Sequence, residues 1–505
     1  MKRIFAILLL ICLVLSLSAC GGIGSVDKPT KKSESSTAES NKTTGSTEAS
    51  TEAGPQETYA LEYVQEGLDA EAVSSQNFSF SKGAMCYFFS LNYSDFISQN
   101  GSYLSYYGLD TSVSLKEQVY EGEETWFDFF MSQATSFAEQ YLIFAEYAKA
   151  QGLSLDQADE EYIDSQEETI RQEAAAYGWD ADTYIGQVLG TNIPLSAVTE
   201  ATRVMLLADK GYDALMSSLS ISDERIEKEY ADNHKAYDLI DFVFVDLLAA
   251  ADLAEADLKA LQDAFDAAKT RADFEAALKL YVEKCVSKED PDKYSGAAGY
   301  AENMMKSSNL AVGYTYYDDD EFMKWAFNGA KADECYLGEN DGTHQYAYLL
   351  VKEPYRNTDS VVDIRHILFG VSTYGDAAKA HARAEEIEKE WIAAGADEDS
   401  FIDYCAQYSE DGNASTGGIY EGVTKGMMVA EFDEWIFDSS RVYGDYGLVD
   451  TTYGTHIMFF VGRHESWYGS VKEALLQKDY DAAVDEMKAA TVIKTQEAVL
   501  EAINW

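Results

Sequence analysis

Two short segments of this chain repeat one another, and the repetition predicts a duplicated module. Residues 321–327 and 431–437 share the pattern Glu-Phe-x-x-Trp-x-Phe, and each is followed by a Gly-containing turn and a short apolar strand. The second copy carries His366 and His456, where alignment gives the first copy Asp241 and Tyr346. We therefore expect two units with one fold, of which only the second is equipped for chemistry.

The amino terminus follows the pattern of a secreted lipoprotein. Lys2 and Arg3 form a basic start, an apolar run covers residues 4–17, and the tetrapeptide Leu17-Ser18-Ala19-Cys20 is a lipobox. The run is too short for a transmembrane helix, which needs roughly 20 residues. We predict a signal peptide over residues 1–19, a lipid on Cys20, and a protein anchored to the outer face of the cell membrane. An ordinary signal peptide with an incidental cysteine is the alternative.

Composition and charge restrict the partners. Residues 20–58 are Ser, Thr, Glu and Lys with almost no large apolar side chain, so they are expected to form a flexible stalk. The formal net charge of −51 argues against nucleic acid as a partner, because its phosphates would repel the chain. The same charge argues against direct adhesion to anionic lipid. The lipid on Cys20, and not the folded body, is expected to hold the protein at the membrane.

Beyond the stalk the chain is long enough for about three domains. The first, residues 79–235, is predicted to be helical, with a long amphipathic run over Trp126–Ala150. Residues 154–157 have the pattern of a capping box that opens the next helix. Another helix follows Pro194, and Ser222 is predicted to cap a short one.

The second and third domains share one plan. They cover residues 237–356 and 361–463, and a C-terminal helical region covers residues 466–505. Each opens with a strand, continues with amphipathic helices, and closes with a short helix and a last strand. The predicted fold class is therefore α+β, with helices around a small sheet, behind a helical first domain.

The third domain carries six short motifs in one order. They are Ile364-Arg365-His366-Ile367-Leu368, Tyr408-Ser409-Glu410-Asp411, Gly417-Gly418, Met428-Val429-Ala430-Glu431-Phe432, Phe437, and Tyr453-Gly454-Thr455-His456-Ile457. With these motifs the domain resembles the parvulin rotamases over its whole length, and residues 237–356 look like a degenerate copy. The lipobox and the helical domain make the whole chain similar to the PrsA-type extracytoplasmic foldase lipoproteins and the SurA-type chaperones.

The resemblance implies a site on the third domain. His366 and His456 are expected to form a central imidazole pair with Asp411 beside it, as the catalytic residues. The expected substrate-binding residues are Met428, Phe432, Phe437, Tyr420 and Tyr453. The resemblance implies no cofactor and no metal.

These residue types suit the isomerisation of an X-Pro peptide bond. Amide resonance sets a barrier of roughly 18–20 kcal/mol to rotation about that bond. A twisted amide has lost the charge separation of its resonance form, so a dry pocket favours it over the planar ground state. A thousandfold acceleration needs only about 4 kcal/mol of such differential binding. Two joined histidines can fix the local tautomers without acting as nucleophiles.

Other interpretations of these residues stay open. His366, His456 and Asp411 have the composition of a two-His-one-carboxylate metal site, and the two histidines could also serve packing alone. Cys405 lies among aromatic side chains and is interpreted as a core residue. A disulfide between Cys285 and Cys335 is a further open alternative, because the sequence does not fix their geometry.

We expect a membrane-anchored, extracytoplasmic peptidyl-prolyl cis-trans isomerase and chaperone that assists the folding of exported proteins. Its partners are expected to be unfolded chains containing X-Pro bonds and, through Cys20, the membrane; a homodimer is left open. The alternative is a catalytically inactive parvulin-fold chaperone that only binds unfolded clients. A solute-binding lipoprotein would require long α/β alternation with parallel strands, which this sequence lacks.

Overall fold

The computed structural model describes residues 63–248, 253–286 and 296–505. They divide into two compact units, one made of the chain up to Leu219 with residues 479–505, the other of residues 220–478. The predicted signal peptide, Cys20 and the stalk lie outside the described residues. Within those described ranges, no helix is long and apolar enough to cross a membrane.

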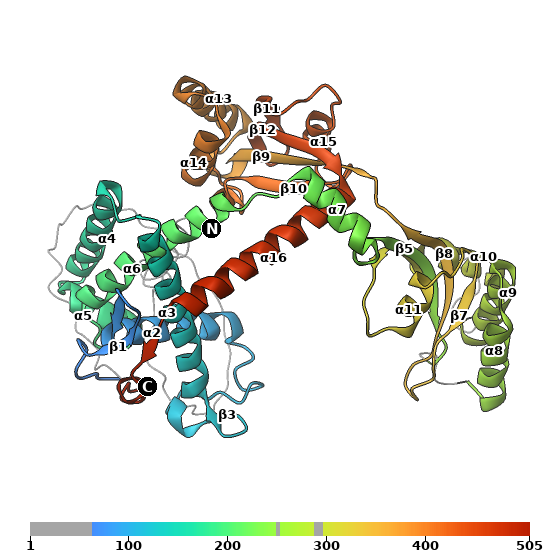
Figure 1. Ribbon diagram of the computed structural model, residues 1–505, viewed down its shortest axis with the longest axis horizontal. Coiled ribbons are helices and arrows are strands. Elements are labelled where there is room, and N and C mark those ends of the chain that lie inside the picture. Colours follow the sequence, from blue (N-terminus) through green and yellow to red (C-terminus); the bar gives the residue numbers. More distant parts are fainter. Residues whose placement is uncertain (1–62, 249–252, 287–295) are drawn as a thin grey trace, which may run out of the picture. The chain divides into compact units, whose positions relative to one another are not determined.

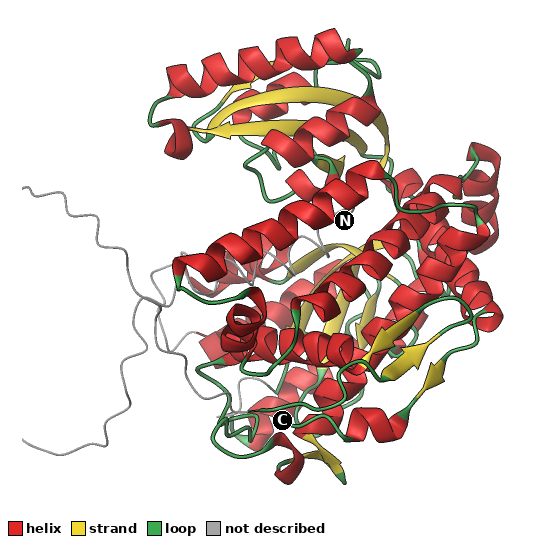
Figure 2. Ribbon diagram, turned by 90° about the vertical axis from the view of Figure 1, so that its left-hand side faces the viewer, coloured by secondary structure: helices red, strands yellow, loops and turns green. Residues whose placement is uncertain are grey.

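The first unit is mainly helical, with a three-stranded antiparallel sheet in the order β13-β1-β2 and a small hairpin (Figures 1 and 2). Its elements are β1 (Glu71–Ser74), β2 (Ser79–Ser81), α2 (Lys82–Asn100), β3 (Val119–Glu121), β4 (Glu124–Thr125), α3 (Trp126–Ala150), α4 (Gln157–Ala176), α5 (Ala181–Leu189), α6 (Leu195–Ser218), β13 (Lys494–Thr495) and α17 (Glu497–Glu501). Helix α16 (Ser466–Ala490) precedes β13.

Local sequence signals explain most of these helix starts. The run predicted at Trp126–Ala150 is confirmed as α3, which Thr125 opens with a capping box. Pro194 precedes α6 as predicted. The capping box of α4 lies two residues later than we predicted, because the Asp156 carboxylate accepts from the backbone N–H groups of Ala158 and Asp159.

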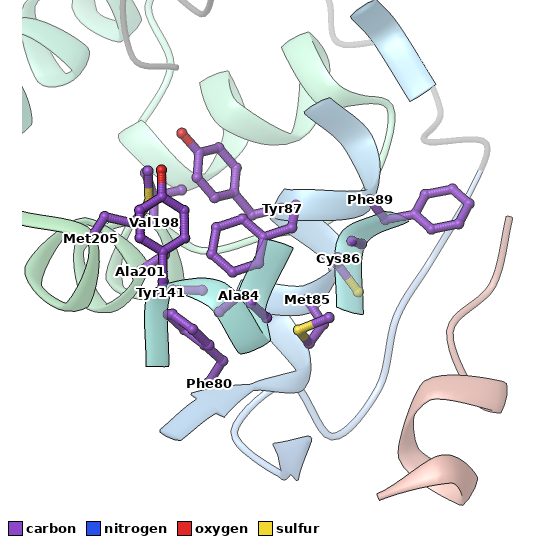
Figure 3. Packing of buried hydrophobic residues seen from close by; sticks show 14 of the residues in the cluster. Phe80, Ala84, Met85, Cys86, Tyr87, Phe89, Tyr141, Val198, Ala201 and Met205 are labelled. Carbon is purple, nitrogen blue, oxygen red and sulfur yellow. The ribbon is translucent and has the colours of Figure 1, made fainter. Parts of the chain in front are cut away.

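Aromatic side chains dominate the core of the first unit. Figure 3 shows Tyr87 beside Val198 of α6, with Phe80 near Tyr141, while Phe89 points to the other side of α2. The carboxyl terminus completes this core, since the ring centroid of Trp505 lies 4.8 Å from that of Phe89. The C-terminal region therefore belongs to the first unit through its last residues.

The second unit contains two α+β modules with the same sheet. The first module has four antiparallel strands in the order β6-β5-β8-β7, and the second has the order β10-β9-β12-β11. The first comprises β5 (Leu239–Asp246), α8 (Glu255–Ala267), α9 (Arg271–Tyr281), α10 (Gly296–Asn303), β6 (Leu310–Thr315), α11 (Glu321–Phe327), β7 (Cys335–Leu337) and β8 (Tyr346–Tyr355). The second comprises β9 (Ser360–Gly370), α12 (Val371–Tyr374), α13 (Ala377–Ala394), α14 (Glu398–Tyr408), β10 (Ile419–Val423), α15 (Ala430–Ile436), β11 (Tyr446–Asp450) and β12 (Gly454–Glu465). The duplication predicted from the repeated segments is confirmed.

Each sheet is covered on both faces. In the second module, α13 and α14 pack on one face through Trp391 and Phe401, and α15 packs on the other through Phe432 and Ile436. In the first module, α8 and α9 take the place of α13 and α14, and α11 takes the place of α15. Alternate residues of each strand serve the two clusters, so a strand position decides which face a side chain joins.

One helix lies in a different unit from the one we expected. Ser222 caps α7 (Asp223–Asn233) as predicted, but Ile226 of α7 packs against Trp467 and Val471 at the start of α16. The helical unit therefore ends at Leu219, and α7 belongs to the second unit.

Candidate active site

The two predicted histidines lie on the central strands of the second module, on the face that α15 covers (Figure 1). His456 of β12 is paired with Leu368 of β9, two residues beyond His366. This register places both imidazoles on the same face, and their Nδ1 atoms lie 2.9 Å apart. Only 1% of His366 and 5% of His456 is exposed. The structure thus brings the predicted imidazole pair together inside the module.

The Gly417-Gly418 loop packs directly behind His366. The backbone N–H of His366 donates to the carbonyl of Gly418 at 2.9 Å. Gly418 has a φ of +67°, and a Cβ added there would lie 2.3 Å from the carbonyl oxygen of His366. Only glycine permits both the left-handed backbone and this approach. The thiol of Cys405 donates to the same carbonyl, and burial raises its pKa, so Cys405 is a core thiol as interpreted.

A chain of hydrogen bonds continues from the histidine pair to Thr451. The Oγ1 of Thr451 lies 2.9 Å from the Nε2 of His456. At the other end, the Nε2 of His366 is buried without a hydrogen-bond partner and lies 3.6 Å from the Oδ2 of Asp411. If Thr451 donates to His456, then His456 donates to His366, and the Nε2 proton of His366 faces the Asp411 carboxylate. With these tautomers, each N–H or O–H group of the chain points at an acceptor. If the hydrogen bonds ran in the opposite direction, the Nε2 lone pair of His366 would point at the carboxylate of Asp411.

Burial keeps the two imidazoles neutral. It lowers the pKa of both His366 and His456 below the ordinary value for histidine. His366 also lowers the pKa of His456, while the negative charge of Asp411 acts in the opposite direction on the pKa of both imidazoles. At neutral pH the pair is therefore a fixed array of hydrogen-bond donors and acceptors and carries no charge.

Rings line the space beside the pair. Phe432 meets His366 and His456 edge to face, with ring centroids 5.5 and 5.4 Å away, and Tyr420 stacks on His366 at 5.2 Å. Met428 and Phe437 are half-buried members of the same cluster. Tyr453 differs from the other predicted substrate-binding residues, because 64% of it is exposed and it projects from the turn before β12.

Two polar residues at the site were not found from the sequence. Thr451 hydrogen-bonds His456. The side chain of Asn413 favours the charged form of His366 and so raises its pKa, but burial lowers that pKa by more. Asn413 also holds the loop, since its Nδ2 donates to the carbonyl of Ile419 at 3.3 Å. Both residues lie in polar turns, where a short motif gives no sign of which side chain faces the site.

The first module carries other rings at the equivalent positions. Tyr348 of β8 is paired with Phe244 of β5, two residues beyond Phe242, so Phe242 and Tyr348 occupy the places of His366 and His456. Our alignment of Asp241 and Tyr346 with the histidines was therefore wrong. The alignment was shifted by one residue on β5 and by two residues on β8. A shift of one residue along a strand moves the side chain to the opposite face of the sheet.

Phe322 of α11 completes the set of rings in the first module. It stacks on Tyr348 with ring centroids 4.0 Å apart and lies 4.9 Å from Phe242. It therefore corresponds to Phe432 of the second module. The first module keeps the packing of the site and lacks its imidazole nitrogens.

Two observations bear on alternatives that the sequence left open. Within the ranges that the structure describes, no group of three or more His, Cys, Asp or Glu side chains is arranged to hold a metal ion. Cys335 is a free thiol, so the disulfide with Cys285 is not formed.

Comparisons with known proteins agree with this geometry. Residues 348–462 match the family described as the PPIC-type PPIase domain. Chaperone SurA of Burkholderia orbicola is 24% identical over 346 residues, which cover 65% of this chain and 70% of that protein.

Solved structures are similar as well. A PpiC-type peptidyl-prolyl cis-trans isomerase domain is 22% identical and covers 21% of this chain and 94% of its own, with a TM-score of 0.19. The peptidylprolyl isomerase PrsA of Bacillus anthracis is 15% identical and covers 55% of this chain and 91% of its own, with a TM-score of 0.18. The family match assigns residues 348–462 to the PPIC-type, or parvulin-type, peptidyl-prolyl cis-trans isomerase domains, and the chain around this domain is similar to the SurA chaperones.

Proposed function

We propose that this protein is a membrane-anchored, extracytoplasmic foldase. Its second module isomerises X-Pro bonds, and its helical unit holds exported chains while they fold. The observation that carries this proposal is the neutral, buried His366–His456 pair, with Nδ1 atoms 2.9 Å apart, beside the ring of Phe432. This pair lies inside the segment that matches the PPIC-type PPIase domain.

Catalysis needs only non-covalent work from these residues. The proline ring binds against Phe432, Met428 and Phe437, which remove water from the amide. The imidazole pair and Asp411 then present a fixed hydrogen-bond pattern to the amide as it twists. Because the twisted amide carries less charge separation than the planar one, an apolar surface stabilises it preferentially, and about 4 kcal/mol of such preference gives a thousandfold rate.

The matched test copies the first module into the second. The double substitution His366→Phe/His456→Tyr introduces the rings that the equivalent sheet of the first module carries as Phe242 and Tyr348. We expect the variant to fold and to suppress client aggregation as the wild type does, but to lose acceleration of a proline-limited refolding step. An unchanged refolding rate in a folded variant would remove His366 and His456 from the mechanism. If the wild-type protein does not accelerate the isomerisation of X-Pro bonds in short peptides, the result favours the chaperone that only binds its clients.

The membrane anchor is a separate part of the proposal. It is supported by the lipobox at residues 17–20, and by the acidity of the chain, which disfavours direct adhesion to anionic lipid. The substitution Cys20→Ser should move the protein from the membrane fraction to the soluble extracytoplasmic fraction. A variant that stays with the membrane would contradict lipid anchoring. A homodimer stays a prediction, and sedimentation of the full chain tests it.

A further inference from the structure

Three segments meet at the carboxyl end of β9, next to the imidazole pair. The backbone N–H of Gly370 donates to the Oε2 of Glu410 at 3.1 Å, and that of Val371 donates to the carbonyl of Tyr453 at 2.9 Å. Asp411, adjacent to Glu410, lies 3.6 Å from His366. We call Glu410 and Asp411 the acidic rim of the site.

The Glu410 carboxylate is held in place. Its Oε2 also accepts from the hydroxyl of Thr373 at 2.7 Å. A Cβ at Gly370 would lie 2.8 Å from the same oxygen, so a larger residue there would push the carboxylate aside. The backbone N–H of Glu410 donates to the carbonyl of Leu368, the residue paired with His456. The carboxylate is thus fixed to the strand that carries His366.

No lysine or arginine neutralises this rim. Across the described parts of the chain, neither Glu410 nor Asp411 forms an ion pair with a Lys or Arg side chain. Asp411 lies beside His366, which burial keeps neutral, and accepts a hydrogen bond from the uncharged hydroxyl of Tyr420 at 3.3 Å. Asp450, the other carboxylate that acts on His456, is partnered by His381 at 2.8 Å. The rim therefore presents uncompensated negative charge to a bound peptide.

The geometry also decides which part of the peptide meets the rim. Phe432 covers one side of both imidazoles, where the proline ring binds. The buried Nε2 atom of His366 faces Asp411, whose Oδ2 lies 3.6 Å away. An X-Pro amide that lies over the pair therefore directs the residue before proline towards Asp411 and Glu410. The exposed ring of Tyr453, on the neighbouring turn, is available to stack on a cationic side chain.

We propose that this isomerase domain prefers a basic residue, Lys or Arg, immediately before proline, and that Glu410 together with Asp411 determines the preference. The proposal rests on the isomerase activity of the second module and deepens it by naming the substrate class. An exposed ion pair changes affinity by up to about fivefold, and like charges oppose binding by a similar factor. A lysine peptide should therefore be isomerised roughly ten times more efficiently than a glutamate peptide.

The test uses the full chain and exchange NMR, which needs no coupling protease. The probes are acetyl-Ala-Xaa-Pro-Phe-amide peptides with Lys, Leu or Glu at Xaa, at concentrations far below saturation, where the catalysed exchange rate reports kcat/KM. We expect the order Lys, then Leu, then Glu, with a Lys-to-Glu ratio that shrinks in 1 M salt because the rim is exposed. Equal or reversed rates for Lys and Glu overturn the preference while leaving the activity intact, and no catalysis of any peptide overturns both.

Two variants assign the preference to the rim. Glu410→Gln keeps an acceptor for Gly370 and Thr373 and should lower the Lys-to-Glu ratio about threefold to fivefold, as expected for one exposed pair. Glu410→Lys should bring the glutamate peptide above the lysine peptide. Glu390→Gln is the matched control, because it removes the same charge from α13 on the opposite face of the sheet. If Glu410→Gln and Glu390→Gln give the same ratio, Glu410 does not determine the preference.

Discussion

Replacing Gly418 by alanine tests how tightly the loop behind His366 is packed. The left-handed backbone, with a φ of +67°, costs a non-glycine residue about 1–2 kcal/mol. The new Cβ would lie 2.3 Å from the carbonyl oxygen of His366, so the loop must move away and lose its 2.9 Å hydrogen bond to the N–H of His366. An unmade buried hydrogen bond costs about 1–3 kcal/mol. We therefore expect the second module to lose about 3–4 kcal/mol of stability.

Isomerase activity in urea measures this loss in the full chain, because activity reports only the module that carries His366. With a denaturant slope of roughly 1–2 kcal/mol per M, the midpoint of inactivation should fall by about 2 M. Gly422→Ala is the matched control, since Gly422 has a φ of +64° but no atom within 4 Å of an added Cβ. Its midpoint should fall by about 1 M or less. Equal midpoints for the two variants would refute the close packing of Gly418 against His366.

Three further predictions follow from the structure. Burial lowers the pKa of His456 to about 4, so the unfolded chain binds a proton at this residue before the folded chain does as the pH falls below about 6.5. The free energy of unfolding should therefore decline below about pH 6.5, while the isomerase rate stays level from pH 8 to about 5. A loss of isomerase rate centred near pH 6.5 would contradict this. Thr451→Val should lower the catalysed cis–trans exchange rate of X-Pro peptides, measured by NMR, several-fold, whereas Thr451→Ser should not. Equal rates for the two variants would show that the hydroxyl bonded to His456 does not contribute. Trp505→Ala should cost about 3–5 kcal/mol and lower hydrogen-exchange protection of α2; unchanged protection would contradict its role in the core.

Local patterns in the sequence predicted the elements best. The amphipathic run of α3 and the cap at Ser222 give signals that depend only on nearby residues, and both are confirmed. The fold class was also predictable, because the repeated helix predicted two units with one plan. The two histidines came together as expected, since they lie in motifs on two apolar strands.

The register of the strands and the contacts between distant parts of the chain could not be predicted from the sequence. The pairing of Phe244 with Tyr348 fixes which residues replace the histidines, and a slip of one residue in the alignment is enough to choose the wrong face. The placement of α7 depended on Trp467, which lies far along the chain, and no local pattern of α7 names that partner. Thr451 was missed for a similar reason, because a hydroxyl in a polar turn shows its role only once β12 is folded.

The two modules together argue that the histidines are present for chemistry. Phe242, Tyr348 and Phe322 fill the same space in the first module with stacked rings, so the fold does not need imidazoles there. In the second module, the two imidazoles are buried polar groups, and the Nε2 of His366 lies 3.6 Å from the Oδ2 of Asp411, so this pair costs more to bury than the rings of the first module. Packing alone would favour the rings of the first module. A scaffold that keeps a costly imidazole pair at this position is explained by the work the pair does on a bound amide, because local rules are broken mainly where function requires it.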